Sequence, residues 1–273
     1  MTNLGQISRL VILVLVGWVL TAVVDWPAWT LPLIVLDSPL TLRLSSAWLV
    51  AFVLVILVSA GTDGLLRLRP GGADARYRQT APAWVLPSIA AGIPPLLLVK
   101  LQLLSTPWFL LLAGAGIGLA LVLLAEAHAA DPPSRFCPAA RAGLTVLVYT
   151  AALLTFATIY SLHVRTVLSG TATTLLGFAL ALALLRWSAG PGTRIWPHAA
   201  VTAVLVGLAT WGLNHKPVDS LAGGGLLLLV FYVATGVAQQ LIQRNLSRRI
   251  LIEFAVAVAL GLLLLIGFSG QGG

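Results

Sequence analysis

The sequence predicts an all-α fold, a polytopic transmembrane helix bundle of about nine spans. The chain has 273 residues, of which 59% are hydrophobic and 9% charged, and its mean hydropathy is +1.00. Soluble domains carry about 25% charged residues, so this chain has too few polar groups to cover its surface in water. The composition therefore excludes a soluble enzyme, a nucleic-acid-binding domain and a disordered regulator.

Apolar runs of spanning length follow one another along the chain. A spanning helix needs about 20 mainly apolar residues, because each residue rises about 1.5 Å through hydrocarbon about 30 Å thick. This length predicts spans at 7–26, 44–66, 83–103, 107–129, 142–163, 166–186, 197–214, 219–242 and 249–268. No small-residue cleavage site follows the first run, so we interpret it as an uncleaved span. We expect residues 1–273 to form a single integral membrane domain.

Two features interrupt the regular pattern of the first three spans. Residues 31–36 are apolar but too short to cross, so we expect them to lie in the interface or to dip back against other helices. In the third span, Pro87 and the pair Pro94 and Pro95 predict kinks that leave carbonyls near the middle of the membrane without helical donors. Such breaks occur in transporter sites, and simple packing kinks are the alternative.

Small residues predict close helix packing in two spans. Gly114 and Gly118 form a small-xxx-small spacing in the fourth span, and Gly223, Gly224 and Gly225 open the eighth. Such residues let helix backbones approach closely, either inside the bundle or at a dimer seam.

The basic residues predict which way the bundle faces. With the N-terminus in the cytoplasm, 12 of the 16 Lys and Arg residues fall in inner loops, and the outer ones are Arg43, Lys100, Arg165 and Lys216. Cytoplasmic loops carry an excess of basic residues, so this distribution predicts a cytoplasmic N-terminus and a C-terminus outside. The net charge of +8 is therefore an orientation signal. Because the basic residues form no patch, we expect no nucleic-acid partner.

Ionisable residues lie near the ends of the predicted spans rather than at mid-depth. A proton-driven carrier or pump needs a carboxylate or a lysine at mid-depth, so this distribution counts against one. The candidate site is a cytoplasmic-boundary polar cluster made up of Asp63, Arg67, Glu126, Arg186, Arg249 and Glu253. Two of its pairs have i, i+4 spacing, which favours a structural ion-pair ring that fixes the helix ends. The alternative is a binding site for a polar head or a phosphate.

Motifs for catalysis and metal binding are missing from the sequence. It contains no HExxH, no GxSxG, no P-loop and no acidic pair that would hold Mg²⁺. The one cysteine, Cys137, excludes a thiolate metal site. His163 and His215 share a depth on the outer side, as His128 and His198 do on the inner side. Each pair is therefore a candidate set of ligands for a haem or a chlorophyll-type pigment. None lies in mid-span or at metal-motif spacing, so we predict no cofactor, no metal and no catalytic residue.

Several short motifs are spread between the second and ninth predicted spans. They are AGTDGLLR at 60–67, WVLP at 84–87, LAE at 124–126, IY at 159–160 with Arg165, and GVAQQ at 236–240 before Arg248 and Arg249. Together they resemble an uncharacterised family of bacterial multi-pass integral membrane proteins, carried as a domain of unknown function. The resemblance implies a helical membrane fold in the cell inner (plasma) membrane and implies no catalytic residue.

Three functions are compatible with this reading. The first is a non-catalytic integral membrane protein that acts as a scaffold or accessory subunit of a membrane complex, with the lipid bilayer and other membrane subunits as partners. The second is a transporter or channel for an uncharged or lipidic substrate, supported by the prolines of the third span and by Tyr149, Tyr160 and Tyr232. The third is a membrane enzyme that acts on lipid or isoprenoid at the inner interface through Asp63, Glu126 and Glu253.

Overall fold

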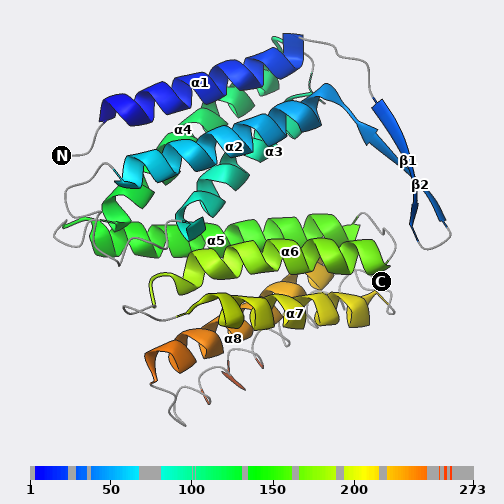
Figure 1. Cartoon of the computed structure of the whole chain (residues 1–273), viewed down its shortest axis with the longest axis vertical. Coiled ribbons are helices and arrows are strands. Elements are labelled where there is room, and N and C mark those ends of the chain that lie inside the picture. The colour runs from blue at the N-terminus through cyan, green and yellow to red at the C-terminus, as the bar shows by residue number, and fades with distance from the viewer. Residues whose placement is uncertain are drawn as a thin grey trace. The chain divides into compact units, whose positions relative to one another are not determined.

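Helices make up most of the described part of the chain in the computed structural model (Figure 1). The structure describes residues 4–23, 29–35, 38–67, 81–99, 101, 103–130, 135–161, 166–188, 194–214 and 220–244, with 252, 255, 256 and 259. The chain divides into two compact units, unit 1 (Met1–Arg141) and unit 2 (Ala142–Gly273).

Both units are built from long apolar helices. In chain order, the described elements of unit 1 are α1 (Leu4–Val23), β1 (Trp29–Val35), β2 (Ser38–Leu44), α2 (Ser46–Arg67), the short 3-10 helix η2 (Ala81–Trp84), α3 (Val85–Leu98) and α4 (Thr106–Ala129). Unit 2 contains most of α5 (Cys137–Ser161), followed by α6 (Thr166–Leu185), α7 (Trp196–Leu213) and α8 (Ser220–Gln243). Six of these helices, α1, α2, α4, α5, α7 and α8, are long and apolar enough to cross a membrane.

The first eight predicted spans coincide with the eight helices, so the prediction of apolar helices of membrane-spanning length is confirmed for six of them. The apolar helical segments Pro82–Leu98 and Ser169–Leu185, in the third and sixth, are shorter. The ninth predicted span, 249–268, lies outside the described residues except for four positions, which are helical and exposed: Ile252, Ala255, Val256 and Ala259. The count of nine spans, the orientation of the termini and the single membrane domain therefore stay predictions.

A two-stranded hairpin between α1 and α2 is the departure from the all-helical prediction within the described residues. β1 and β2 pair antiparallel, from Trp29 opposite Leu44 to Val35 opposite Ser38. Alternate positions are apolar along both strands, which is the two-residue period of a strand with one apolar face. Pro32 and Pro39 are tolerated because both strands of a two-stranded ribbon are edges. The interfacial or re-entrant placement of 31–36 overlooked the partner strand at 38–44.

The helices of unit 1 pack around a core of aliphatic side chains and two tryptophans, Trp18 and Trp108. Figure 1 shows α1 and α2 side by side with the hairpin joining them at one end. The core takes side chains from all four helices: Val14 and Trp18 of α1, Leu54 and Val58 of α2, Ala91 and Leu98 of α3, and Leu119 and Leu123 of α4. Close approach depends on glycine at Gly116, where a Cβ would lie 2.9 Å from the Leu15 side chain. Gly116 therefore makes a close helix contact inside this unit, whereas a Cβ at either member of the predicted pair, Gly114 and Gly118, would meet nothing within 4 Å among the described residues.

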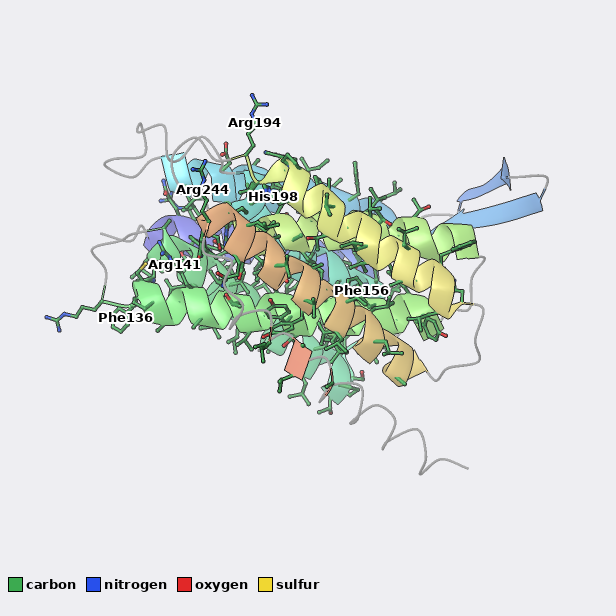
Figure 2. All side chains as sticks on the ribbon, turned by 90° about the horizontal axis from the view of Figure 1, so that it is seen from below. Phe136, Arg141, Phe156, Arg194, His198 and Arg244 are labelled. Atoms are coloured by element: carbon green, nitrogen blue, oxygen red, sulfur yellow. The ribbon has the colours of Figure 1, made fainter. Side chains whose placement is uncertain are left out.

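Unit 2 is held by two kinds of helix contact. The α6–α7 contact brings backbones together, since a Cβ at Gly207 would lie 3.4 Å from the carbonyl oxygen of Gly170. The α5–α8 contact includes the Phe156 and Phe231 rings, whose centroids are 5.9 Å apart. Figure 2 labels Phe156. Gly224 also belongs to this contact, because a Cβ there would lie 2.6–2.8 Å from Ala157. Gly223 and Gly224, two of the three glycines that open the predicted eighth span, thus serve packing within the chain.

Candidate functional site

The proline break in α3 is the feature that the sequence singled out as a possible transport site. Pro94 and Pro95 carry no N–H, so the carbonyls of Ala90 and Ala91, four residues earlier, lose their helical donors. The indole Nε1 of Trp18 donates to the carbonyl oxygen of Ala91 at 2.9 Å. Trp18 is fully buried, and a buried indole N–H needs an acceptor. A tryptophan in α1 therefore supplies the hydrogen bond that Pro95 removes from α3.

The segment of α3 that contains the prolines also contacts α2. Ser59 of α2 and Ser88 of α3 share a hydrogen bond of 2.8 Å between their hydroxyl oxygens. A Cβ at Gly92 would lie 2.9 Å from the side chain of Val55, so α2 lies directly against this part of α3. The polar groups near the break are thus used to join helices, which is the packing alternative raised by the sequence.

The predicted cytoplasmic-boundary polar cluster is described only in part. Asp63 lies half-buried on α2, and Glu126 is buried on α4 with 2% of its side chain exposed. Arg186 follows α6 and belongs to unit 2, whereas Asp63 and Glu126 belong to unit 1. The side chain of Arg67, and both Arg249 and Glu253, lie outside the described part. The predicted ring of these six residues therefore stays a prediction.

The turn between α4 and α5 uses several polar groups that could have formed a site. The carbonyl oxygen of Ala129, at the end of α4, accepts from Nε of Arg141 at 3.3 Å and from Sγ of Cys137 at 3.6 Å. A cation at a helix C-terminus stabilises the last carbonyls. Nδ1 of His128 donates to the carbonyl oxygen of Leu124 at 2.8 Å, because a carbonyl can only accept. Arg141 and Cys137 therefore cap the end of α4, and His128 bonds within its last turns.

The histidines considered as ligands do not form a described metal site. His163 and His215, the positions weighed for a haem or a pigment, lie outside the described residues. His128 and His198 belong to different units. Nδ1 of His128 donates to the carbonyl oxygen of Leu124, and Nδ1 of His198 donates to the carbonyl oxygen of Arg194, just before α7. Within the described ranges, no group of three His, Cys, Asp or Glu side chains is placed to hold a metal ion.

Buried hydroxyl groups connect the helices of unit 2. Thr173 of α6 and Thr210 of α7 lie 3.0 Å apart through their hydroxyl oxygens, and both side chains are fully buried. Nearby, Nδ2 of Asn214 donates to Oγ of Ser169 at 2.7 Å. On the α5–α8 side, the hydroxyls of Tyr149 and Thr235 lie 3.3 Å apart. These pairs join neighbouring helices in the way expected of buried polar groups in membrane spans.

A groove between α7 and α8 is a feature that the sequence reading missed. Its volume is about 800 Å³, and its walls are almost entirely aliphatic, including Val201, Leu205, Leu229, Val233 and Val237. Three alanines line it where larger side chains would have filled the space: Ala209, Ala234 and Ala238. Those alanines are visible in the sequence, but nothing in it indicates that the two helices turn them toward the same space.

The position of the groove along the helices is defined by the residues at its two ends. Pro197 and His198, near the start of α7, and Leu241, near the end of α8, line one end. Leu213 and Leu226 line the other end. The groove therefore extends along nearly the whole of α7 and along α8 from Leu226 to Leu241.

The fold and its apolar helices define the class: this is a helical membrane protein, with six helices capable of crossing a bilayer in its described part. The chain belongs to the family described as a protein of unknown function, DUF5656, whose model matches residues 26–268. The resemblance to an uncharacterised membrane family is thereby confirmed. No curated protein and no solved structure matches the chain.

Proposed function

We propose that this chain is a non-catalytic integral membrane protein of the bacterial inner membrane that acts as a scaffold or accessory subunit of a membrane complex. The observation that carries the proposal is the use of the proline break: the carbonyl freed by Pro95 is bound by Trp18. In carriers and membrane enzymes, polar groups at mid-membrane depth converge on a cavity or a substrate path. Among the described residues, Trp18, Ser59 and Thr173 instead join one helix to another, which suits a protein that acts as a rigid scaffold.

A subunit also needs a surface for its partners. α2 presents a row of large exposed side chains at i, i+3 and i+4 spacing: Trp48, Leu49, Phe52, Val53 and Ile56. Phe52 alone is 66% exposed. Such a row lies against lipid or against the apolar face of another transmembrane helix. It is the surface at which we would first look for a partner subunit.

Crosslinking in the native membrane followed by purification in two mild detergents tests the subunit role. A partner should be recovered at constant stoichiometry in both detergents. The paired change Phe52→Ala with Ile56→Ala should reduce its recovery, whereas Leu110→Ala with Ile117→Ala, on the exposed face of α4, provides a matched control. A chain that runs alone in both detergents and forms no crosslinks would count against the proposal.

Transport of an uncharged or lipidic substrate is the second candidate. It needs a continuous path past the proline segment of α3, and there the Trp18 indole is hydrogen-bonded to the carbonyl oxygen of Ala91. Flux measurements in proteoliposomes would test it. Saturable uptake that is lost when the proline segment of α3 is blocked would support transport as the function.

Catalysis at the inner interface is the third candidate and depends on Asp63, Glu126 and Glu253. The burial of Glu126 is the observation in its favour, since an ionisable side chain at 2% exposure is costly unless it has a task. Glu126→Gln and Asp63→Asn should abolish an activity or a ligand without lowering expression if the carboxylates are catalytic. If both changes only lower the yield of folded protein, the carboxylates are structural.

A further inference from the structure

The α7–α8 groove has the size and chemistry of a site for a hydrocarbon chain. Its volume of about 800 Å³ lies within the range of about 300–1,000 Å³ in which proteins hold small ligands. From Pro197 to Leu213 its lining covers 16 residue steps of α7, or about 24 Å at about 1.5 Å per residue, whereas one leaflet of hydrocarbon is about 15 Å thick. A single acyl chain therefore fits along it from either side of the membrane.

One end of the groove is basic. We call the residues Arg194, His198 and Arg244 the basic end. His198 lines the groove itself, and its Nδ1 donates to the carbonyl oxygen of Arg194 at 3.3 Å. Arg244 follows α8, and its backbone N–H donates at 3.2 Å to the carbonyl oxygen of Leu241, another lining residue. Figure 2 labels all three where α7 begins and α8 ends.

The basic end has no carboxylate to neutralise it within the described part of unit 2, which contains no Asp and no Glu. Arg194 and Arg244 are both exposed. The start of α7 adds partial positive charge, because the first N–H groups of a helix point outward and Ile195 makes no side-chain cap there. The local field therefore favours an anion at this end of the groove.

We propose that the α7–α8 groove binds an anionic phospholipid, with the phosphate at the basic end and an acyl chain along the aliphatic walls. A guanidinium group binds two phosphate oxygens at once through parallel hydrogen bonds. Basic pockets between transmembrane helices bind acidic head groups. A free phosphate would make no use of the aliphatic walls. A partner helix would make no use of Arg194 and Arg244, which face no carboxylate from the described part of unit 2. This site goes beyond the scaffold role and exists with or without a partner subunit.

The orientation predicted from the basic loops agrees with this ligand. Arg194 and Arg244 both fall on the predicted cytoplasmic side, and the cytoplasmic leaflet is the one that carries a negative surface potential from anionic lipids.

Native mass spectrometry of the full chain tests the proposal directly. The chain is reconstituted into bilayers of phosphatidylglycerol and phosphatidylcholine in equal amounts, extracted, and examined for retained lipid. The anionic lipid should be retained at least about tenfold over the zwitterionic one, since one charged hydrogen-bonded contact is worth about a factor of ten. Equal retention of the two lipids by the unaltered chain would overturn the proposal before any variant is made.

Variants separate the two halves of the site. Arg194→Ala with Arg244→Ala should remove the preference for phosphatidylglycerol, and Ala234→Phe should lower retention of that lipid by filling the groove. The matched controls are Arg135→Ala, which removes an exposed arginine of unit 1, and Ala200→Phe, which enlarges an exposed alanine of α7 outside the groove lining. Both controls should retain the lipid as the unaltered chain does.

Three results would contradict the lipid site. Inorganic phosphate that displaces the lipid, combined with no effect of Ala234→Phe, would indicate a simple anion site. A dimer or a bound protein that persists after complete delipidation and is lost in Ala234→Phe would indicate that a helix occupies the groove. Retention that is unchanged in both groove variants would show that the lipid binds elsewhere. If the alanine variant fails to fold, lipid retention by Arg194→Lys with Arg244→Lys is compared with retention by the unaltered chain, because this variant keeps the charge and removes the guanidinium groups.

Discussion

Trp18 and Pro95 act on the same carbonyl, so the effects of replacing them are expected to depend on each other. Trp18→Phe keeps an aromatic ring in the core and removes the 2.9 Å hydrogen bond to Ala91. The carbonyl then has neither an indole nor a helical donor, and leaving such a buried group unsatisfied costs about 1–3 kcal/mol. Measured interhelical hydrogen bonds in membranes average less than this, about 0.6 kcal/mol, because most polar groups find other partners. Ala91 lacks its usual helical donor, so we expect about 2 kcal/mol.

Trp108→Phe is the matched control for this change. Trp108 is also buried, with 3% exposure, but its Nε1 has no hydrogen-bond partner within the described residues. Both substitutions lose the same ring atoms, whereas only Trp18→Phe breaks a hydrogen bond. The free energy of unfolding in detergent micelles, followed by circular dichroism, should therefore fall by about 1–3 kcal/mol more for Trp18→Phe.

Pro95→Ala completes a double-mutant cycle. It restores an N–H at position 95, which donates to the carbonyl of Ala91 as in a regular helix. In that background, Trp18→Phe should cost about 1–2 kcal/mol less than in the natural sequence, which is the coupling energy of the pair. Additive effects, within about 0.5 kcal/mol, would refute the view that Trp18 compensates for the missing N–H of Pro95.

Two further predictions concern helix contacts. Gly224→Ala should destabilise the chain by about 1–3 kcal/mol in the same assay, because its Cβ would meet Ala157, including backbone atoms, at 2.6–2.8 Å. Gly114→Ala, where a Cβ meets nothing within 4 Å, should be neutral or slightly stabilising, and equal losses at the two sites would contradict this reasoning. Thr173→Val should cost about 0.6–2 kcal/mol through the lost hydrogen bond to Thr210, and an unchanged unfolding midpoint would show that the α6–α7 hydroxyl pair does not contribute.

Helix positions were predictable because each span carries its own signal. Between residues 4 and 243 the helices follow runs of apolar residues whose length matches a bilayer, and a helix satisfies its own backbone within those residues. The hairpin at Trp29–Leu44 was not predicted, because its pairing depends on two short segments together. Taken by itself, the run 31–36 is marked by its hydrophobicity, and its two-residue alternation becomes meaningful only with the partner strand.

The candidate sites show the same division. Pro94, Pro95 and the mid-span Trp18 stand out in the sequence as separate irregularities, and only the packing of α1 on α3 shows that they share one hydrogen bond. Arg194, Arg244 and the alanines of α7 and α8 each look ordinary, so no local signal points to a groove with a basic end.

The sequence by itself determined that this chain is a membrane protein, where its helices lie and which family it belongs to, because hydrophobic length and backbone satisfaction are properties of one segment at a time. Tertiary structure alone decided which of the unusual residues in the spans are used in helix contacts and which line a groove. The carbonyl of Ala91 in α3 accepts a hydrogen bond from the indole of Trp18 in α1, and the small residues of α7 and α8 face a groove. Both outcomes depend on helix rotation and partner choice, which in a bilayer are determined by packing and hydrogen bonding between helices rather than by hydrophobicity.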